Sequence, residues 1–178
     1  VKTSQIIWLA IILISAVFVY GQALAPVLRV NGETLSWRDF FRRLDGFSRY
    51  KVLSGQKISD LDLERGVLLS FTEEALIKGE LSLRGVSDGD VEKFVAGKVN
   101  AADIPNLDAA SRRLYGWGFE DFKKLVLYPQ ARLLMLMEEF QKDKLDAASW
   151  LDQSLQTAKI SVYLPRWKWE DGEFRRRY

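Results

Sequence analysis

The chain opens with an almost unbroken run of apolar residues. Residues 3–28 carry no charge, and between Ile6 and Tyr20 only Ser15 is polar. A helix of about 20 apolar residues is long enough to cross the roughly 30 Å hydrocarbon core of a bilayer. We therefore predict a transmembrane anchor over residues 3–26.

Two other interpretations of this run stay open. Ala23-Leu24-Ala25 has the small-residue spacing of a signal-peptide cleavage site, but the run exceeds the roughly 7 to 15 apolar residues usual for such a segment. A core helix that is apolar on every face would need a much larger protein to cover it. The anchor is the favoured interpretation. If the short N-terminus stays inside, the rest of the chain lies on the extracytoplasmic side of the cell membrane.

Strand signals follow the run directly and return near the other end of the chain. Residues 27–30 predict a short strand, and Asn31-Gly32 predicts a tight turn after it. Residues 160–164 alternate between apolar and polar side chains, as in a half-buried strand. Because a lone strand leaves its backbone groups unsatisfied, we expect these two strands to pair in a small two-stranded sheet.

Helical periodicity fills the space between the two strands. Ser36, Ser59 and Ser87 each stand three residues before an aspartate, which is a helix-capping pattern, and each opens a periodic segment. The first of these helices should end at residues 54–55 and the second near residue 84.

The second half of the chain shows a weaker helical pattern before a stronger one. A loop is predicted over residues 101–106 and a short helix over 108–115. A long stripe then runs from Phe119 to about residue 155, and Pro129 predicts a kink or break near Tyr128. The whole pattern predicts a mainly α fold.

Three parts of the chain follow from these patterns. They are the transmembrane anchor over residues 3–26, a helical domain with its small sheet over residues 27–164, and a Trp/Arg-rich C-terminal tail over residues 165–178. The domain is long enough to bury a core of its own.

Charge argues against a nucleic-acid partner. Of the 26 basic residues only Lys2 precedes Arg29, so the part after the apolar run carries nearly equal numbers of basic and acidic side chains. A nucleic-acid binder usually shows a strong basic excess or stripe. We therefore expect no nucleic-acid partner.

The residue types that carry most enzymatic chemistry are absent. The chain has no His and no Cys, which excludes Ser-His-Asp triads, thiol nucleophiles and His- or Cys-based metal sites. Gly116-Trp117-Gly118 lacks the third glycine of a dinucleotide fingerprint. We therefore predict a non-enzymatic protein with no cofactor and no metal. The absence of Cys also fits an extracytoplasmic location.

Several motifs together resemble one family. The stretch over residues 30–40, VNGETLSWRDF, looks like the opening of the N-terminal chaperone domain shared by SurA, PpiD and PrsA-type foldases. Gly85-Val86-Ser87-Asp88 is similar to the passage from the long second helix of these proteins to the next. Residues 115–122 resemble the turn before the following helix, and 127–136 that helix itself. The resemblance covers most of residues 27–145.

This resemblance implies an extracytoplasmic domain, often anchored by one N-terminal helix, that holds unfolded or exported polypeptides in an apolar crevice. Many members also carry a parvulin-type prolyl isomerase domain, whose sites typically use histidines. Between Phe140 and Ile160 this chain has room for one helix only, and it has no His. Prolyl isomerase activity is therefore not expected.

Our leading hypothesis is a membrane-anchored, chaperone-like protein that binds client polypeptides through an apolar groove without a nucleotide. The candidate client-binding residues are aromatic or flexible apolar side chains: Phe47, Tyr50, Trp117, Phe119, Met135 and Met137. Ordinary core packing is the competing interpretation for each of them. Two other functions stay open, namely a structural or assembly protein that docks one dedicated envelope partner, and a diverged relative whose partner supplies catalysis.

The C-terminal tail offers a second candidate surface. Indoles and basic groups are favoured at the headgroup level of a membrane. The candidate membrane-interface residues are Arg166, Trp167, Lys168 and Trp169. The alternative interpretation is a frayed, partly packed tail.

Overall fold

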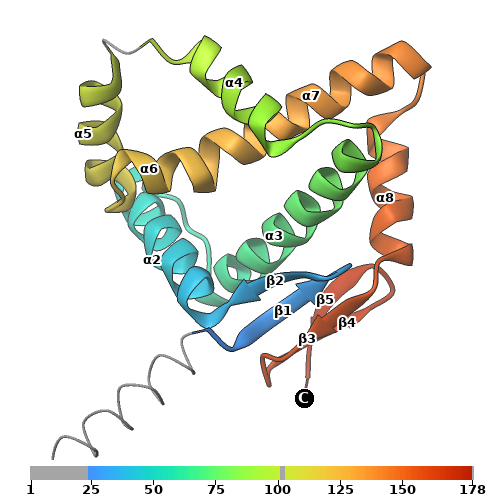
Figure 1. Cartoon of the computed structure of the whole chain (residues 1–178). Helices are drawn as coiled ribbons and strands as arrows, with labels where there is room; N and C mark the ends of the chain where they lie inside the picture. The colour runs from blue at the N-terminus through green and yellow to red at the C-terminus, as the bar shows by residue number, and fades with distance from the viewer. Residues whose placement is uncertain (1–23, 101–102, 178) are drawn as a thin grey trace, which may run out of the picture.

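A sheet at one side of the molecule supports a layer of helices, in a computed structural model that describes residues 24–100 and 103–177. The strands lie together at the bottom of Figure 1 and most of the helices stand above them. The mainly helical fold with a small sheet is thereby confirmed. The predicted transmembrane segment lies almost wholly outside the described residues. Within the described ranges, no helix is long and apolar enough to cross a membrane.

The main sheet joins the two ends of the domain. Its strands are β1 (Pro26–Val30), β2 (Glu33–Ser36) and β3 (Ile160–Val162), in the order β2-β1-β3 with both pairs antiparallel. Leu28 lies opposite Val162, which confirms the predicted pairing of the two terminal strands.

The prediction of only two strands in this sheet was wrong. Asn31 and Gly32 have φ values of 48° and 98°, the left-handed backbone of a two-residue hairpin turn. This turn folds residues 33–36 back along β1 as a third strand. Four residues that include Glu33 and Ser36 have too little apolar alternation to be recognised as a strand from the sequence.

Strand β1 buries consecutive side chains because its register is irregular. The pairing with β2 shifts between Pro26 and Leu28. A bulge of this kind interrupts the alternation of side chains, so both Val27 and Leu28 are fully buried. Arg29 points outward and Val30 returns to the core.

The helical layer follows the order of the chain. The helices are α2 (Trp37–Ser54), α3 (Asp60–Leu83), α4 (Asp88–Lys98), α5 (Ile104–Tyr115), α6 (Phe119–Phe122), the π-helical segment η2 (Lys123–Leu127), α7 (Tyr128–Asp143) and α8 (Ala147–Thr157). The three predicted serine caps are confirmed. The hydroxyls of Ser36 and Ser59 accept the N–H of the aspartate three residues on at 3.1 Å, and that of Ser87 does so at 3.2 Å.

The second half of the helical layer differs in detail from the prediction. Helix α5 begins at Ile104, inside the predicted loop, because Pro105 is well suited to a first helical turn. The predicted kink or break near Tyr128 is not a break, because Leu127 and Tyr128 both keep helical backbone angles. Instead the π-helical segment η2 gives way there to α7, which has Pro129 in its first turn. Lys144, with φ 56°, separates α7 from α8.

The C-terminal residues form a hairpin, so the frayed-tail interpretation was wrong. Strands β4 (Trp167–Glu170) and β5 (Glu173–Arg176) pair antiparallel around Asp171-Gly172. Trp167 and Phe174 are each 3% exposed and belong to the main core. The Trp167 indole N–H donates to Glu64 of α3 at 3.0 Å. Up to Arg177, the predicted tail is therefore part of the packed domain. Its signals, an Asp-Gly turn beside alternating aromatic residues, were present in the sequence.

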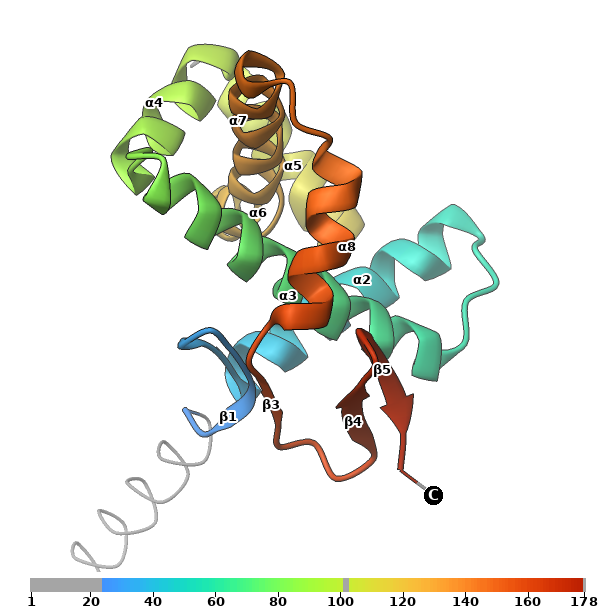
Figure 2. The same ribbon diagram turned by 90° about the vertical axis from the view of Figure 1, so that its right-hand side faces the viewer.

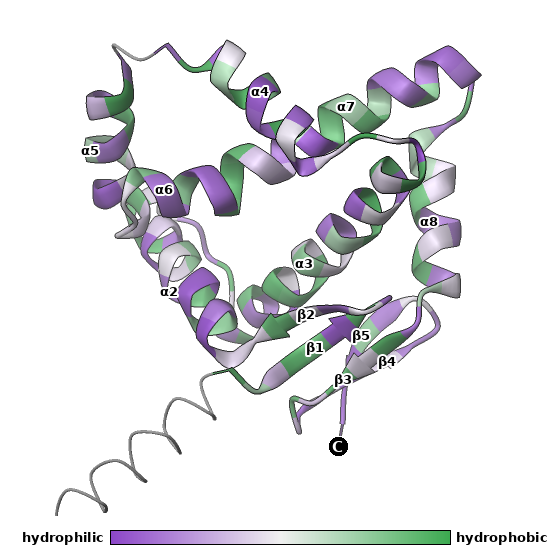
Figure 3. Cartoon of the chain, in the orientation of Figure 1, coloured by the Kyte–Doolittle hydropathy of each residue, from purple (hydrophilic) through white to green (hydrophobic). Residues whose placement is uncertain are grey.

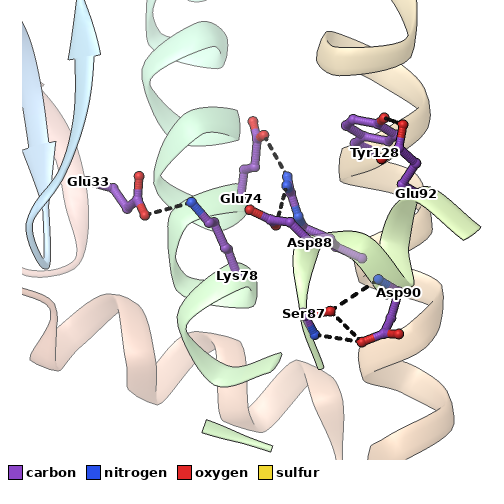
Figure 4. A network of polar contacts seen from close by, with 9 residues as sticks. Glu33, Glu74, Lys78, Ser87, Asp88, Asp90, Glu92 and Tyr128 are labelled. Atoms are coloured by element: carbon purple, nitrogen blue, oxygen red, sulfur yellow. Dashed lines mark hydrogen bonds and ion pairs between the residues drawn. The ribbon is translucent and has the colours of Figure 1, made fainter. Parts of the chain in front are cut away.

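A chain of ion pairs links four helices above the sheet. The Arg43 side chain, 7% exposed on α2, donates to Glu74 of α3 at 2.8 Å. Arg132 of α7 donates to Glu74 at 3.3 Å and to Asp88, the first residue of α4, at 3.0 Å. Figure 4 shows Glu74 and Asp88 on either side of the guanidinium that they both bind, beside the exposed pair of Glu33 and Lys78.

This chain of ion pairs predicts a large cost for removing its central carboxylate. Glu74→Gln leaves Arg43 buried without an opposite charge, so we expect a loss of about 3–5 kcal/mol in the free energy of unfolding, measured by chemical denaturation. Glu33→Gln is the matched control, because its pair with Lys78 is exposed and should contribute at most about 1 kcal/mol. Equal losses for the two variants would contradict the prediction.

Candidate functional site

Four aromatic rings gather where the end of α2 meets the end of α5. Tyr115 lies between Tyr50 and Trp117, with ring centroids 5.3 Å and 4.9 Å away and planes within 11° of parallel. Phe47 meets Tyr115 and Trp117 edge-on, at 6.3 Å and 5.7 Å. Offset stacking and edge-to-face contacts are the favoured aromatic geometries, so this cluster is a rigid apolar wall.

The absence of a side chain at Gly46 allows this cluster to form. A Cβ atom there would lie 2.0 Å from Cζ2 of Trp117, far inside van der Waals contact. The indole therefore lies directly against the backbone of α2, and its N–H donates to the Arg42 carbonyl at 3.3 Å. Gly116, with φ 75°, ends α5 and turns the chain so that Trp117 reaches this position.

Asp108 holds the next turn in place. Its carboxylate accepts the Phe119 N–H at 2.7 Å and the Arg112 Nε–H at 2.8 Å, which ties α5 to the start of α6. The Arg112 guanidinium, together with the Phe119 N–H, holds the pKa of Asp108 below its usual value. The carboxylate is therefore charged at neutral pH and keeps both bonds.

Beside the aromatic wall lies an open groove of about 400 Å³ between α2 and α3. Its lining residues are Phe47, Tyr50, Lys51, Gln56, Ile58, Asp62, Leu63, Gly66, Val67, Ser70 and Tyr115. Figure 2 shows the end of α2 and the start of α3 projecting together from the molecule, joined by the loop that contributes Gln56 and Ile58.

The groove is largely apolar and its polar groups stand mainly at the rim. Lys51 is held by Asp60 at 2.9 Å. Burial, with a smaller contribution from Tyr50, raises the pKa of Tyr115, so this wall stays uncharged at neutral pH. Val52 and Leu53, 72% and 57% exposed, continue the apolar surface past the end of the groove.

These properties suit binding more than catalysis. Ligand pockets of about 300–1,000 Å³ are mostly apolar with a few polar groups, which matches this groove. Each apolar side chain buried there would contribute about 1.5–3 kcal/mol. Among the described residues no group of three or more acidic side chains is placed to hold a metal ion.

The structure brings together only some of the predicted client-binding residues. Phe47 and Tyr50 line the groove, and Trp117, 4% exposed, supports its wall from behind. Phe119 is half-buried and does not line the groove. The core-packing interpretation therefore holds for Trp117.

The two methionines lie elsewhere, on α7. Met135 is half-buried and packs against two core clusters, one under α4 and one under α3. Met137 is 43% exposed beside Leu133 and Leu134, in the apolar stretch that Figure 3 shows in the middle of α7. Neither methionine lines the groove.

Sequence reasoning missed three important parts of the groove. Tyr115 belongs to its aromatic wall, Ile58 lines it from the loop between α2 and α3, and Gly66 lines it without a side chain to fill the space. One signal could have pointed to α3: positions 63, 66, 67 and 70 fall on one helical face that combines small and apolar residues. Nothing in the sequence indicated that α5 returns to α2.

The predicted membrane-interface residues do not form one exposed surface. Trp167 is buried, so its indole faces the protein interior and not a headgroup layer. Trp169 packs edge-on against Phe174, and Lys168 pairs with Glu170 at 2.8 Å. Arg166 remains 57% exposed while bonding Glu64 at 3.2 Å.

Comparison of the chain with protein-family models, curated proteins and solved structures gave no match. The resemblance to the SurA, PpiD and PrsA-type chaperone domain therefore stays a prediction. What the chain does has to be argued from the groove and its surroundings.

The contact of Trp117 with Gly46 gives a test of how the wall is built. Gly46→Ala forces the buried indole to move, so we expect the free energy of unfolding to fall by about 1–3 kcal/mol in chemical denaturation. Gly79→Ala is the control within α3, where a new Cβ meets nothing within 4 Å. Removing a helical glycine there should raise stability by up to about 1 kcal/mol. A Gly46→Ala variant as stable as Gly79→Ala would refute this packing.

Proposed function

We propose that this protein is a chaperone-like binder that holds short apolar segments of unfolded or exported polypeptides in the groove between α2 and α3. The observation that carries the proposal is an open groove of about 400 Å³ with a preformed aromatic wall. Such a surface recognises apolar side chains without regard to their sequence, because the hydrophobic effect is non-directional.

The groove is built to bind without rearrangement. Tyr115 is held between two rings, and Gly116 and Gly46 determine where it lies. Rigid aromatic side chains lose little conformational entropy when a partner binds. Release needs no nucleotide, since a client that folds withdraws its own apolar residues from the groove.

We further propose that the protein works at the surface of a membrane, tethered by residues 3–26. The uncharged run leads directly into β1, which begins at Pro26. The tether therefore has no linker that would let the domain move freely. A client emerging on the extracytoplasmic side would meet the domain next to the bilayer. We infer that the domain acts without isomerase activity.

Filling the groove should abolish client binding without harming the fold. Gly66 lines the groove and has open space around it, so Gly66→Leu places an apolar side chain inside while improving helix propensity. We expect the full chain in lipid nanodiscs to suppress light scattering by several unrelated, chemically denatured proteins. Gly66→Leu should weaken this suppression about tenfold or more, because it removes the space for one buried side chain.

Gly79→Leu is the matched control, since it adds the same side chain to the same helix outside the groove. It should suppress scattering as well as the unchanged chain does. Equal activity of the two leucine variants would contradict the proposed groove. Failure of the unchanged chain with every client, together with tight binding of one envelope protein, would instead favour a dedicated docking function.

A further inference from the structure

The outer face of the main sheet is exposed in the part of the chain that the structure describes. Arg29 of β1 lies opposite Thr34 of β2 and Ser161 of β3, and all three are exposed. Tyr163, two residues beyond Ser161, is 47% exposed, and its ring lies 6.0 Å from the Arg29 guanidinium carbon. In both Figure 1 and Figure 2 the helices stand on the other side of the sheet.

The open end of the C-terminal hairpin extends this face. The Arg177 N–H donates to the Arg166 carbonyl at 2.9 Å, which places the end of β5 beside the loop after β3. The two figures are related by a turn about the vertical axis, and in both the chain end and this loop are at the bottom of the molecule with β1. We call Arg29, Tyr163, Arg166, Arg176 and Arg177 the basal surface.

Charge is distributed unevenly along the hairpin. Glu170, Asp171 and Glu173 are at its closed tip, where they pair with Arg175 or Lys168. At the open end the charged residues are all arginines, namely Arg166, Arg176 and Arg177. Arg29, Arg176 and Arg177 form no ion pair with any described residue, and Arg166 bonds Glu64 alone among the acids. Of its four arginines, Arg166 is paired with Glu64, and Arg176 also lines a hollow that includes Asp62, Glu170 and Glu173. Because Arg29 and Arg177 have no acidic partner among the described residues, the basal surface remains positive.

The chain itself indicates what lies against this surface. Leu24, 64% exposed, leads into β1, the central strand of the same sheet, and the Tyr163 N–H donates to the Val27 carbonyl at 2.9 Å. Twenty-three residues precede Leu24, and from Thr3 onward none of them is charged. A segment that enters a bilayer at this point brings the basal surface against the headgroups.

We propose that the basal surface docks on anionic lipid headgroups and so fixes the orientation of the domain on the membrane. Arginines bind phosphate oxygens in bidentate geometry, and tyrosine is favoured at the interface between water and hydrocarbon. This inference rests on the tether in the proposed function but not on client binding. Its consequence is that the helical layer and the groove are held in a fixed orientation above the bilayer.

The absence of cysteine allows a direct test with single spin labels on the full chain. Ser161→Cys places a nitroxide on the outer face of the sheet, and Ala109→Cys places one on exposed α5 as a control. Power-saturation EPR with a water-soluble nickel chelate then reports how far each label is shielded in nanodiscs. The discs contain phosphatidylcholine alone or with about 30% phosphatidylglycerol, an anionic lipid that should attract the arginines.

We expect the label at position 161 to be shielded in the anionic discs and the label at 109 to stay accessible. Each arginine near an anionic surface should change the ratio of docked to undocked domains about fivefold. The triple variant R29Q/R176Q/R177Q should therefore lower this ratio about a hundredfold. The control triple R113Q/K124Q/K144Q removes three unpaired charges from the helical layer and should leave it nearly unchanged. About 1 M NaCl should undock the domain because it shortens the screening length to about 3 Å.

Each contrary outcome overturns a distinct step. Equal accessibility of the two labels in discs that retain the protein would refute docking and leave the tether intact. Failure of the chain to remain with the discs would refute the tether and, with it, the docking. If added inorganic phosphate shields the label at position 161 in discs of phosphatidylcholine alone, the surface binds a free anion and not an anionic lipid. Unchanged shielding in R29Q/R176Q/R177Q would show that charge is not the cause.

Discussion

Everything in this fold depends on β1 lying between two partners. Its residues Val27, Leu28 and Val30 are fully buried, and its backbone bonds β2 on one side and β3 on the other. Because Leu28 lies opposite Val162, the chain must leave the sheet, form all its helices, and return to the same sheet. A buried strand without its partners would leave backbone groups unsatisfied, which is costly. The pairing therefore closes the chain into a loop of helices above one small sheet.

That closed loop explains why the groove exists where it does. Trp117 brings α5 and α6 onto the middle of α2 through its contact with Gly46, while Glu74 joins α3 to both α2 and α7. These two links hold α2 and α3 firmly near their middles. Their connected ends extend beyond the links, and apart from Tyr115 no described residue outside these two helices and their loop lines the space between them. An apolar groove with one aromatic wall is what remains.

The two proposed surfaces lie on different parts of the molecule and use different physics. The groove is largely apolar and has a preformed aromatic wall, which suits contact with many apolar sequences. The basal surface is positive, and it borders the point where the chain enters the sheet. Ion pairs neutralise most of the basic residues near the core. Arg29, Arg176 and Arg177 form no ion pair with any described residue, so positive charge remains at the basal surface.

Local signals in the sequence determined the caps, the helix ends and the two terminal strands, because a serine cap or a Gly55 stop depends on residues within one or two turns. The same local signals placed Phe47 and Tyr50 among the candidate binding residues. Only the tertiary structure decided that Tyr115 stacks on Tyr50, that Trp117 is a support and that Trp167 is buried. These outcomes depend on contacts between residues about 65 to 100 positions apart, which no local period records.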